Sequence, residues 1–207
     1  FLGIVVCNTA FILCISTATS ALPVYLIEAL HMPAWIVGIA FTLNTVLLTG
    51  LQTFVVRLAE PHRRTRVLVV AGLVWIVSCA LLALALVLPQ SLLIPYILIV
   101  VSIYTFGELL QAPTASALVV EASPEALQGR YVATYQLLAW GVGTSVAPAL
   151  FTALFTLRPA YPWAVLAGLM LIAILSIFWL EPRLPDQAVR TGAYQAKAAT
   201  SEAEKST

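Results

Sequence analysis

Long apolar runs separated by short polar breaks dominate this chain of 207 residues. A helix needs about 20 apolar residues to cross the hydrocarbon core of a membrane. Six runs are long enough, and charged or proline-containing breaks such as "EPHRRTR" and "LRPAYPW" separate them. The pattern therefore predicts an all-α, polytopic membrane domain at residues 1–180. Its transmembrane spans are expected at 2–29, 35–57, 67–88, 92–120, 131–157 and 163–180. Residues 181–207 have few large apolar side chains, which predicts a disordered cytoplasmic tail.

Composition excludes an ordinary soluble domain. The chain is 61% hydrophobic and 9% charged, whereas soluble domains carry about 25% charged residues. The net charge of +1 gives no reason to expect a nucleic-acid partner. Cys7, Cys14 and Cys79 lie inside apolar runs, which predicts small core residues rather than a metal site or a cofactor. No catalytic constellation stands out at a membrane surface, so the sequence predicts a protein that is not an enzyme.

The positive residues orient the predicted spans. Nine of the ten Lys and Arg residues fall on one side, and only Arg158 falls on the other. The positive-inside rule makes the first side cytoplasmic, so both ends of the six-helix unit are expected in the cytoplasm beneath a plasma membrane. The charged residues on that side either set the topology or latch the helix ends during a transport cycle. They include Arg57, Glu60, Arg63, Arg64, Arg66 and Arg130.

Polar side chains are unevenly distributed among the spans. The third and sixth spans carry almost none and are expected to face lipid. The other four carry polar groups, which in a membrane face protein or a water-filled cavity. In the second span, Thr42, Thr45, Thr49 and Gln52 share an arc of about 80°, with Asn44 to one side. This face is predicted to face a cavity, and hydrogen bonding between helices is the alternative.

The polar and aromatic residues of the second, fourth and fifth spans are the candidates for a substrate path. They are Asn44, Thr45, Thr49, Gln52, Tyr104, Gln111, Tyr135, Gln136 and Trp140.

Prolines and small residues mark irregular or closely packed helices. Pro23, Pro113 and Pro148 lie inside predicted spans, where proline removes a backbone donor and kinks a helix. In the fifth span, Gly141 and Ser145 follow the four-residue spacing that lets helix backbones approach closely. These two residues are therefore predicted to pack against a neighbouring helix.

Glu108 places an ionisable group deep inside the fourth span. A charged residue near the centre of a membrane helix costs about 2.5–3.5 kcal/mol, and each Leu, Ile, Phe or Val returns about 0.3–0.6 kcal/mol. Residues 97–116 contain nine such apolar residues, worth roughly 3–5 kcal/mol, so the helix can insert with its acid. Tyr104, Glu108 and Gln111 share one face. Glu108 is predicted to exchange a proton or contact a substrate, and a permanently neutral carboxyl group that joins helices is the alternative.

The interior of the predicted spans holds no Lys or Arg. A carboxylate or phosphate substrate would favour a buried cation. The sequence therefore favours a small lipophilic substrate that is neutral or cationic, with Trp140 and the tyrosines as stacking surfaces.

Two longer stretches resemble a known family. "VRLAEPHRRTRVL" keeps Leu58, Ala59, Glu60, Arg64 and Leu68 of a signature between the second and third helices. "ASPEALQGRYVATYQLLAWGVGTSVAPAL" resembles the loop and helix that open the last helix pair in bacterial drug-efflux members. Together with the polarity pattern, these stretches resemble the C-terminal six-helix half of a major facilitator superfamily transporter.

The resemblance implies a fold and a function. In that family, helices one, two, four and five of each half line the central cavity, and substrate binds near the midplane between the halves. It implies proton-coupled efflux by a secondary active transporter. It also implies an N-terminal six-helix half, in the same longer chain or in a second chain. The alternative is a truncated half-transporter or a non-transporting membrane interaction subunit.

Overall fold

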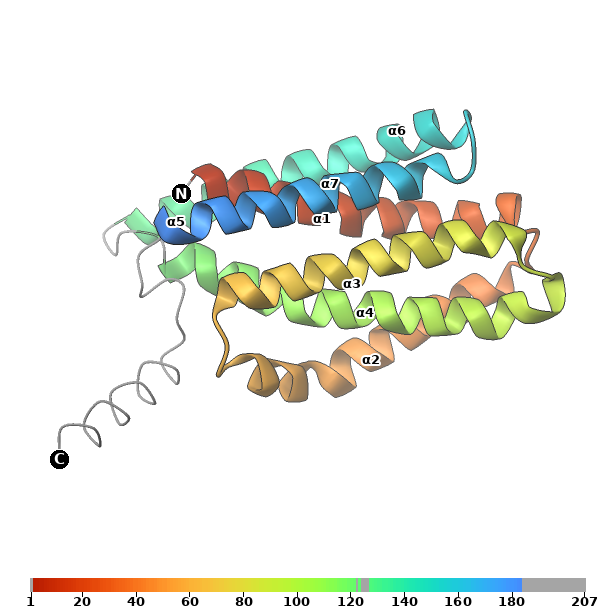
Figure 1. The fold of residues 1–207 in the computed structure, drawn as a ribbon, viewed down its shortest axis with the longest axis horizontal. Helices are drawn as coiled ribbons and strands as arrows, with labels where there is room; N and C mark the ends of the chain where they lie inside the picture. Colours follow the sequence, from red (N-terminus) through yellow and green to blue (C-terminus); the bar gives the residue numbers. More distant parts are fainter. Residues whose placement is uncertain (1, 122, 124–126, 184–207) are drawn as a thin grey trace.

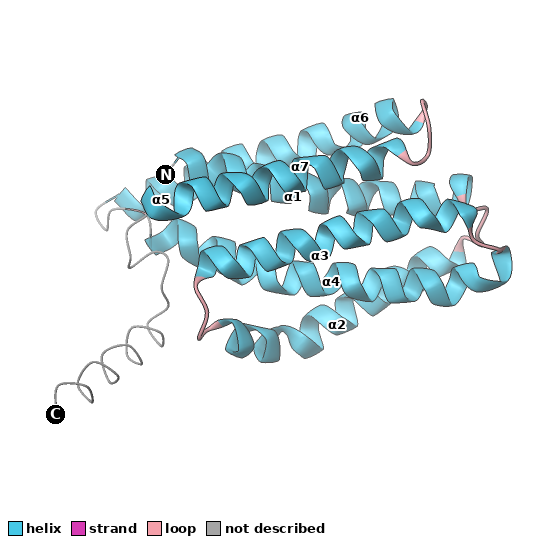
Figure 2. Cartoon of the chain, in the orientation of Figure 1, coloured by secondary structure: helices cyan, strands magenta, loops and turns pink. Residues whose placement is uncertain are grey.

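The computed structural model describes residues 2–121, 123 and 127–183, and every regular element in these ranges is helical (Figures 1 and 2). Six helical stretches are long and apolar enough to cross a membrane. The first three stretches are α1 (Leu2–Val24) with η1 (Tyr25–Ala29), α2 (Trp35–Ala59), and α3 (Arg64–Leu84) with η2 (Ala85–Val87). The last three are α4 (Gln90–Glu121), the fifth helix formed by α5 (Gln128–Tyr135), η4 (Gln136–Val142) and α6 (Gly143–Phe155), and α7 (Tyr161–Leu180). The predicted all-α class is confirmed.

Several helices extend beyond the apolar runs that predicted them. The third begins at Arg64 and the fifth at Gln128, whereas the apolar runs begin at 67 and 131. Hydropathy marks where the hydrocarbon core ends, but polar side chains are equally compatible with helical turns beyond it. Residues 181–207 were expected to form a tail, and the first three of them form the short 3₁₀ helix η5 (Glu181–Arg183). The rest of that prediction lies outside the described residues.

Local chemistry explains how the first helix changes and ends. Pro23 lies inside α1, and the wider turns of the π-helix η1 begin two residues later. His31 adopts a positive φ of 51°, which is the left-handed conformation that ends many helices. The Met32 amide donates to the Leu26 carbonyl at 2.9 Å, which satisfies one carbonyl of the last turn. Pro113 and Pro148 lie inside α4 and α6, which continue past them.

The first three helices pack mainly on the last three. In Figure 1, α2 and α3 lie on α4, whereas α1 lies beside α6 and α7. Helix α3 also contacts α7. Neither group of three helices buries its apolar faces alone, so the bundle is one folding unit.

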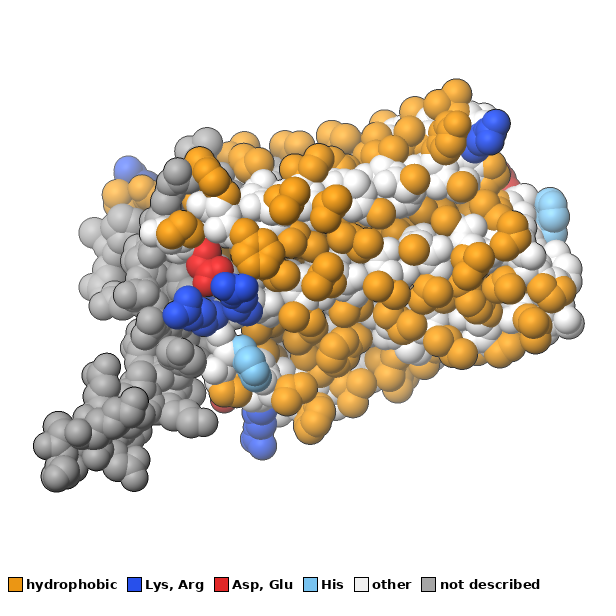
Figure 3. All heavy atoms as spheres, in the orientation of Figure 1, with side chains coloured by type: hydrophobic (Ala, Val, Ile, Leu, Met, Phe, Trp, Pro, Cys, Tyr) orange, Lys and Arg blue, Asp and Glu red, His pale blue; other side chains and the backbone are white. Residues whose placement is uncertain are grey.

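The apolar helices α3 and α7 each have a covered face and an open face. Trp75 of α3 and Trp163 of α7 are fully buried, whereas Val70, Val77 and Leu175 are about half exposed. The uncovered faces form the apolar surface in Figure 3. The expectation that these spans face lipid therefore describes only one side of each helix.

Charged groups gather at one end of the bundle. The start of α1, the end of α7 and the α2–α3 and α4–α5 connections share that end in Figure 1. Blue side chains cluster there in Figure 3, and Arg158, between α6 and α7, lies at the opposite end. The arginines whose side chains the structure describes are thus distributed as the predicted topology requires. Which end faces the cytoplasm stays a prediction.

Candidate functional site

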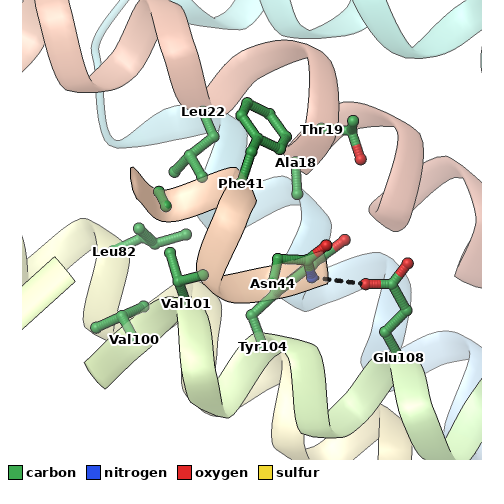
Figure 4. A pocket seen from close by; sticks show the side chains of 11 residues that line it. Ala18, Thr19, Leu22, Phe41, Asn44, Leu82, Val100, Val101, Tyr104 and Glu108 are labelled. Carbon is green, nitrogen blue, oxygen red and sulfur yellow. Dashed lines mark hydrogen bonds between the residues drawn. The ribbon is translucent and has the colours of Figure 1, made fainter. Parts of the chain in front are cut away.

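A cavity of about 160 Å³ opens between α1, α2, α3 and α4 (Figure 4). Its polar lining comes from Thr19, Asn44, Tyr104 and Glu108. Its apolar lining includes Leu22, Phe41, Leu82 and Val101. At 1.5 Å per residue, Glu108 lies about 20 Å from the C-terminal end of α4, deep enough to be within the hydrocarbon core.

Asn44 of α2 holds the carboxyl group of Glu108. Its Nδ2 atom donates to Glu108 Oε2 at 3.1 Å and to Thr105 Oγ1 at 2.9 Å. An amide nitrogen carries two hydrogens, so both donors are used. The Thr105 hydroxyl in turn donates to the Val101 carbonyl at 2.7 Å. Figure 4 shows Asn44 and Glu108 directed toward one another from neighbouring helices.

Contacts with α1 and α3 fix the same stretch of α4. The Tyr104 hydroxyl donates to the Ile15 carbonyl at 3.4 Å, and its ring stacks on Trp75 with centroids 6.0 Å apart. The Trp75 indole N–H donates to the Tyr104 carbonyl at 3.1 Å. This approach requires a glycine at 107, because a Cβ there would lie 2.7 Å from Trp75 Nε1. The backbone that carries Glu108 is therefore held on both sides.

The cavity combines an apolar wall with a few polar groups. Most small-molecule sites have this character, since apolar walls supply affinity and placed polar groups supply orientation. Here the polar groups are one carboxyl, one amide and the hydroxyls of Thr19 and Tyr104. The arrangement suits a lipophilic compound that offers a cation or a hydrogen-bond donor.

Two of the predicted path residues, Asn44 and Tyr104, line this cavity together with Glu108, the predicted proton carrier. Gln111 is buried in the helix packing, where its Nε2 donates to Asn8 Oδ1 at 3.4 Å. Tyr135 is also buried. The candidates that lie exposed and outside the cavity are Thr45, Thr49, Gln52, Gln136 and Trp140. Their place on a substrate path stays a prediction.

Sequence reasoning missed Thr105, which is fully buried beside Asn44. A signal was available, because Thr105 lies three residues before Glu108 and so on the same side of the helix.

The predicted packing of Gly141 and Ser145 is wrong within this chain. Both residues are exposed, and a Cβ on Gly141 would meet nothing within 4 Å. The packed stripe lies two positions further, because a Cβ on Gly143 would lie 2.8 Å from Ile12 Cγ2. Ala139 and Ala147, four residues to either side, are fully buried. The fifth helix carries two stripes of small residues, and only one faces α1.

Ion pairs join the start of α3 to two helix ends. Arg63 and Arg66 both pair with Glu181, at 3.2 and 3.5 Å. Arg64 pairs with Glu121 at the end of α4, at 2.5 Å. Arg57, Glu60 and Arg130 lie exposed at the same end. These contacts tie α3 to α4 and α7, and a latching role during transport stays a prediction.

Six membrane-length helices, four of which line a cavity that holds a carboxyl group, define a polytopic, α-helical membrane protein. The sequence profile of the Major Facilitator Superfamily matches residues 4–204. The chain belongs to this superfamily, and it is therefore a multi-pass membrane transporter domain. None of the curated proteins compared with the chain matches it.

Proposed function

We propose that this chain is the C-terminal half of a secondary active transporter that exports a small lipophilic compound in exchange for protons. The observation that carries the proposal is the position of Glu108, which lines a cavity deep in the bundle and is held by Asn44. In this role Glu108 carries the proton. A carboxyl group that meets water from alternate sides of the membrane can lose a proton on one side and regain it on the other.

The walls of the cavity support a neutral or cationic substrate. Among the described residues that line it, none is basic, so an anionic compound would meet no compensating charge. Glu108 attracts a cation when it is ionised, and the aromatic rings of Phe41 and Tyr104 add apolar surface. Substrate and proton then compete for one carboxyl group, which is the simplest way to couple their movements.

The proposal is tested by replacing the carboxyl group of Glu108 with an amide. Glu108→Gln keeps the size of the side chain but removes its titration. In proteoliposomes that contain the chain together with its N-terminal half, an imposed pH gradient should drive transport of a lipophilic cation by the parent and not by the variant. Glu28→Gln is the matched control, because Glu28 is exposed in η1 and lies outside the cavity. Equal pH-driven transport by the parent and Glu108→Gln would refute the proton-carrying role.

We also propose that an N-terminal six-helix half completes the cavity. The polar residues Thr49, Gln52 and Gln136 lie exposed on α2 and η4, where contact with lipid would leave their hydrogen bonds unmade. A second half would cover them and would close the cavity from the other side. Cysteines introduced at 49 and 136 should react with a thiol reagent in the isolated chain and become protected when an N-terminal half is co-expressed. Transport by the isolated chain would contradict this requirement.

We propose further that the protein lies in the plasma membrane with its arginine-rich end in the cytoplasm, and that it performs no enzymatic reaction. Arg57→Cys and Arg158→Cys place thiols at opposite ends of the bundle. The native cysteines Cys7, Cys14 and Cys79 are buried, so they contribute little background. In intact cells, a membrane-impermeant maleimide should label position 158 and spare position 57. The reverse labelling would contradict the proposed orientation.

A further inference from the structure

A second cavity, of about 200 Å³, lies between the end of α2 and the beginning of α3. It exists because α2 and α3 both pack on α4 rather than closely on each other. Phe106 and Leu110 of α4 line it between the two helices, and Val67 and Val70 of α3 form one wall. Phe106 and Val70 are 38% and 47% exposed, so the groove is open along its side. It lies apart from the cavity that holds Glu108 and shares none of its lining residues.

Basic side chains line the end of this groove nearest the helix termini. Arg66 and His62 belong to its lining. The Arg66 side chain is 55% exposed, and its Nε atom pairs with Glu181 at 3.5 Å. The guanidinium group also lies over the Phe178 ring, 5.1 Å from its centroid. A guanidinium group has five N–H donors in all, and these two contacts leave donors for a further partner. Arg66 can therefore hold a second anionic group while it keeps the first contact.

The groove changes from basic to apolar over one helical turn. Val70 follows Arg66 by four residues on the same face of α3, about 6 Å deeper along the helix axis.

The surrounding end of the bundle favours anions as well. Its described side chains include five arginines and three glutamates, namely Arg57, Arg63, Arg64, Arg66, Arg130, Glu60, Glu121 and Glu181. Figure 3 shows blue side chains and a histidine where the apolar surface ends.

We propose that this groove binds an anionic phospholipid, with the headgroup phosphate on Arg66 and the upper part of an acyl chain against Val70 and Phe106. A phosphate ester is a preferred partner of a guanidinium group. Basic pockets between transmembrane helices bind anionic headgroups in this way. A free anion would use Arg66 and leave the apolar wall empty. A zwitterionic lipid would use the wall, but its own positive group would face the arginine-rich end.

The test uses the purified full chain in micelles that contain phosphatidylglycerol or phosphatidylcholine with identical acyl chains. Native mass spectrometry counts the lipids that stay bound. The parent should retain phosphatidylglycerol in preference to phosphatidylcholine. Arg66→Gln should weaken phosphatidylglycerol binding about fivefold, which corresponds to one basic residue at a membrane surface. Arg66→Lys should keep most of the preference, since it keeps the charge.

Two matched controls separate the groove from general charge and general apolarity. Arg57→Gln removes one positive charge from the same end but outside the groove, and it should leave binding unchanged. Val70→Trp should fill the groove and abolish retention. Val77→Trp, at an equally exposed position of α3 seven residues away, should leave retention intact.

Three results would overturn the proposal. Equal retention of the two lipids would remove the role of the phosphate charge. Equal losses from Arg57→Gln and Arg66→Gln would reduce the effect to a diffuse surface potential. Displacement of phosphatidylglycerol by glycerol 3-phosphate would reveal a headgroup-only anion site. Thermal unfolding of each variant establishes that it is folded, so a lost preference reports on the groove.

Discussion

Gly143→Ala and Gly141→Ala should change the stability of the bundle in opposite directions, although the two glycines are two residues apart in one helix. A Cβ at 143 would lie 2.8 Å from Ile12 Cγ2 and 3.3 Å from the Leu13 backbone nitrogen. The backbone atom cannot rotate away, so α1 and the fifth helix must separate slightly. A Cβ at 141 would meet nothing within 4 Å.

The magnitude follows from two opposing effects. Replacing a helical glycine by alanine gains about 0.5–1 kcal/mol from reduced backbone entropy. Adding a methyl group to a tightly packed contact loses about 1–3 kcal/mol. Gly141→Ala should show only the gain in backbone entropy, whereas Gly143→Ala should show both this gain and the loss from overpacking. The backbone effect cancels when the two variants are compared, so Gly143→Ala should be about 1–3 kcal/mol less stable than Gly141→Ala.

Reversible unfolding in mixed micelles, titrated with sodium dodecyl sulfate and followed by circular dichroism, measures this difference. Ile12→Ala combined with Gly143→Ala should lose less stability than the sum of the single changes, because the shortened side chain relieves the contact. Equal stability of Gly141→Ala and Gly143→Ala would refute the assigned packing face of the fifth helix.

Two further changes test other contacts. Gly107→Ala should destabilise the bundle by about 1–3 kcal/mol relative to Gly168→Ala. A Cβ at 107 would meet the Trp75 indole, whereas a Cβ at 168 would meet nothing within 4 Å. Unfolding titrations that show no difference between the two variants would contradict the close approach of α3 and α4. Glu181→Gln should lower stability by about 0.5–1 kcal/mol by removing the partner of two arginines. That loss should largely disappear in 1 M NaCl, where the Debye length falls to about 3 Å, and a loss independent of salt would argue against an ionic cause.

The candidate site was only partly predictable. Glu108 stands out in the sequence because an acid inside a long apolar run is expensive, and that argument needs no knowledge of its neighbours. Its partner did not stand out. Gln111 follows it by three residues, but the structure pairs Gln111 with Asn8 and gives Glu108 the amide of Asn44, from a different helix. Spacing along one helix reports a shared face and not the helix that this face meets.

The packing of the fifth helix shows the same limit. Gly141 and Gly143 belong to two stripes of small residues with the same four-residue spacing. Either stripe could have faced α1, because close approach requires only small side chains. The fit of Ile12 against Gly143 decided between them, and that fit depends on the rotation of two helices about their own axes.

The sequence alone determined the helical class, the number of spans and the presence of a costly acid within one of them. It could do so because a bilayer offers no partner for backbone N–H and C=O groups, so an apolar run of sufficient length must be a helix. Tertiary structure alone decided the rotation of each helix and its neighbours, and hence which polar groups share the cavity and where α2 and α3 leave a groove. Those choices depend on side-chain fit between segments far apart in the chain, and a periodic pattern along one helix does not contain that information.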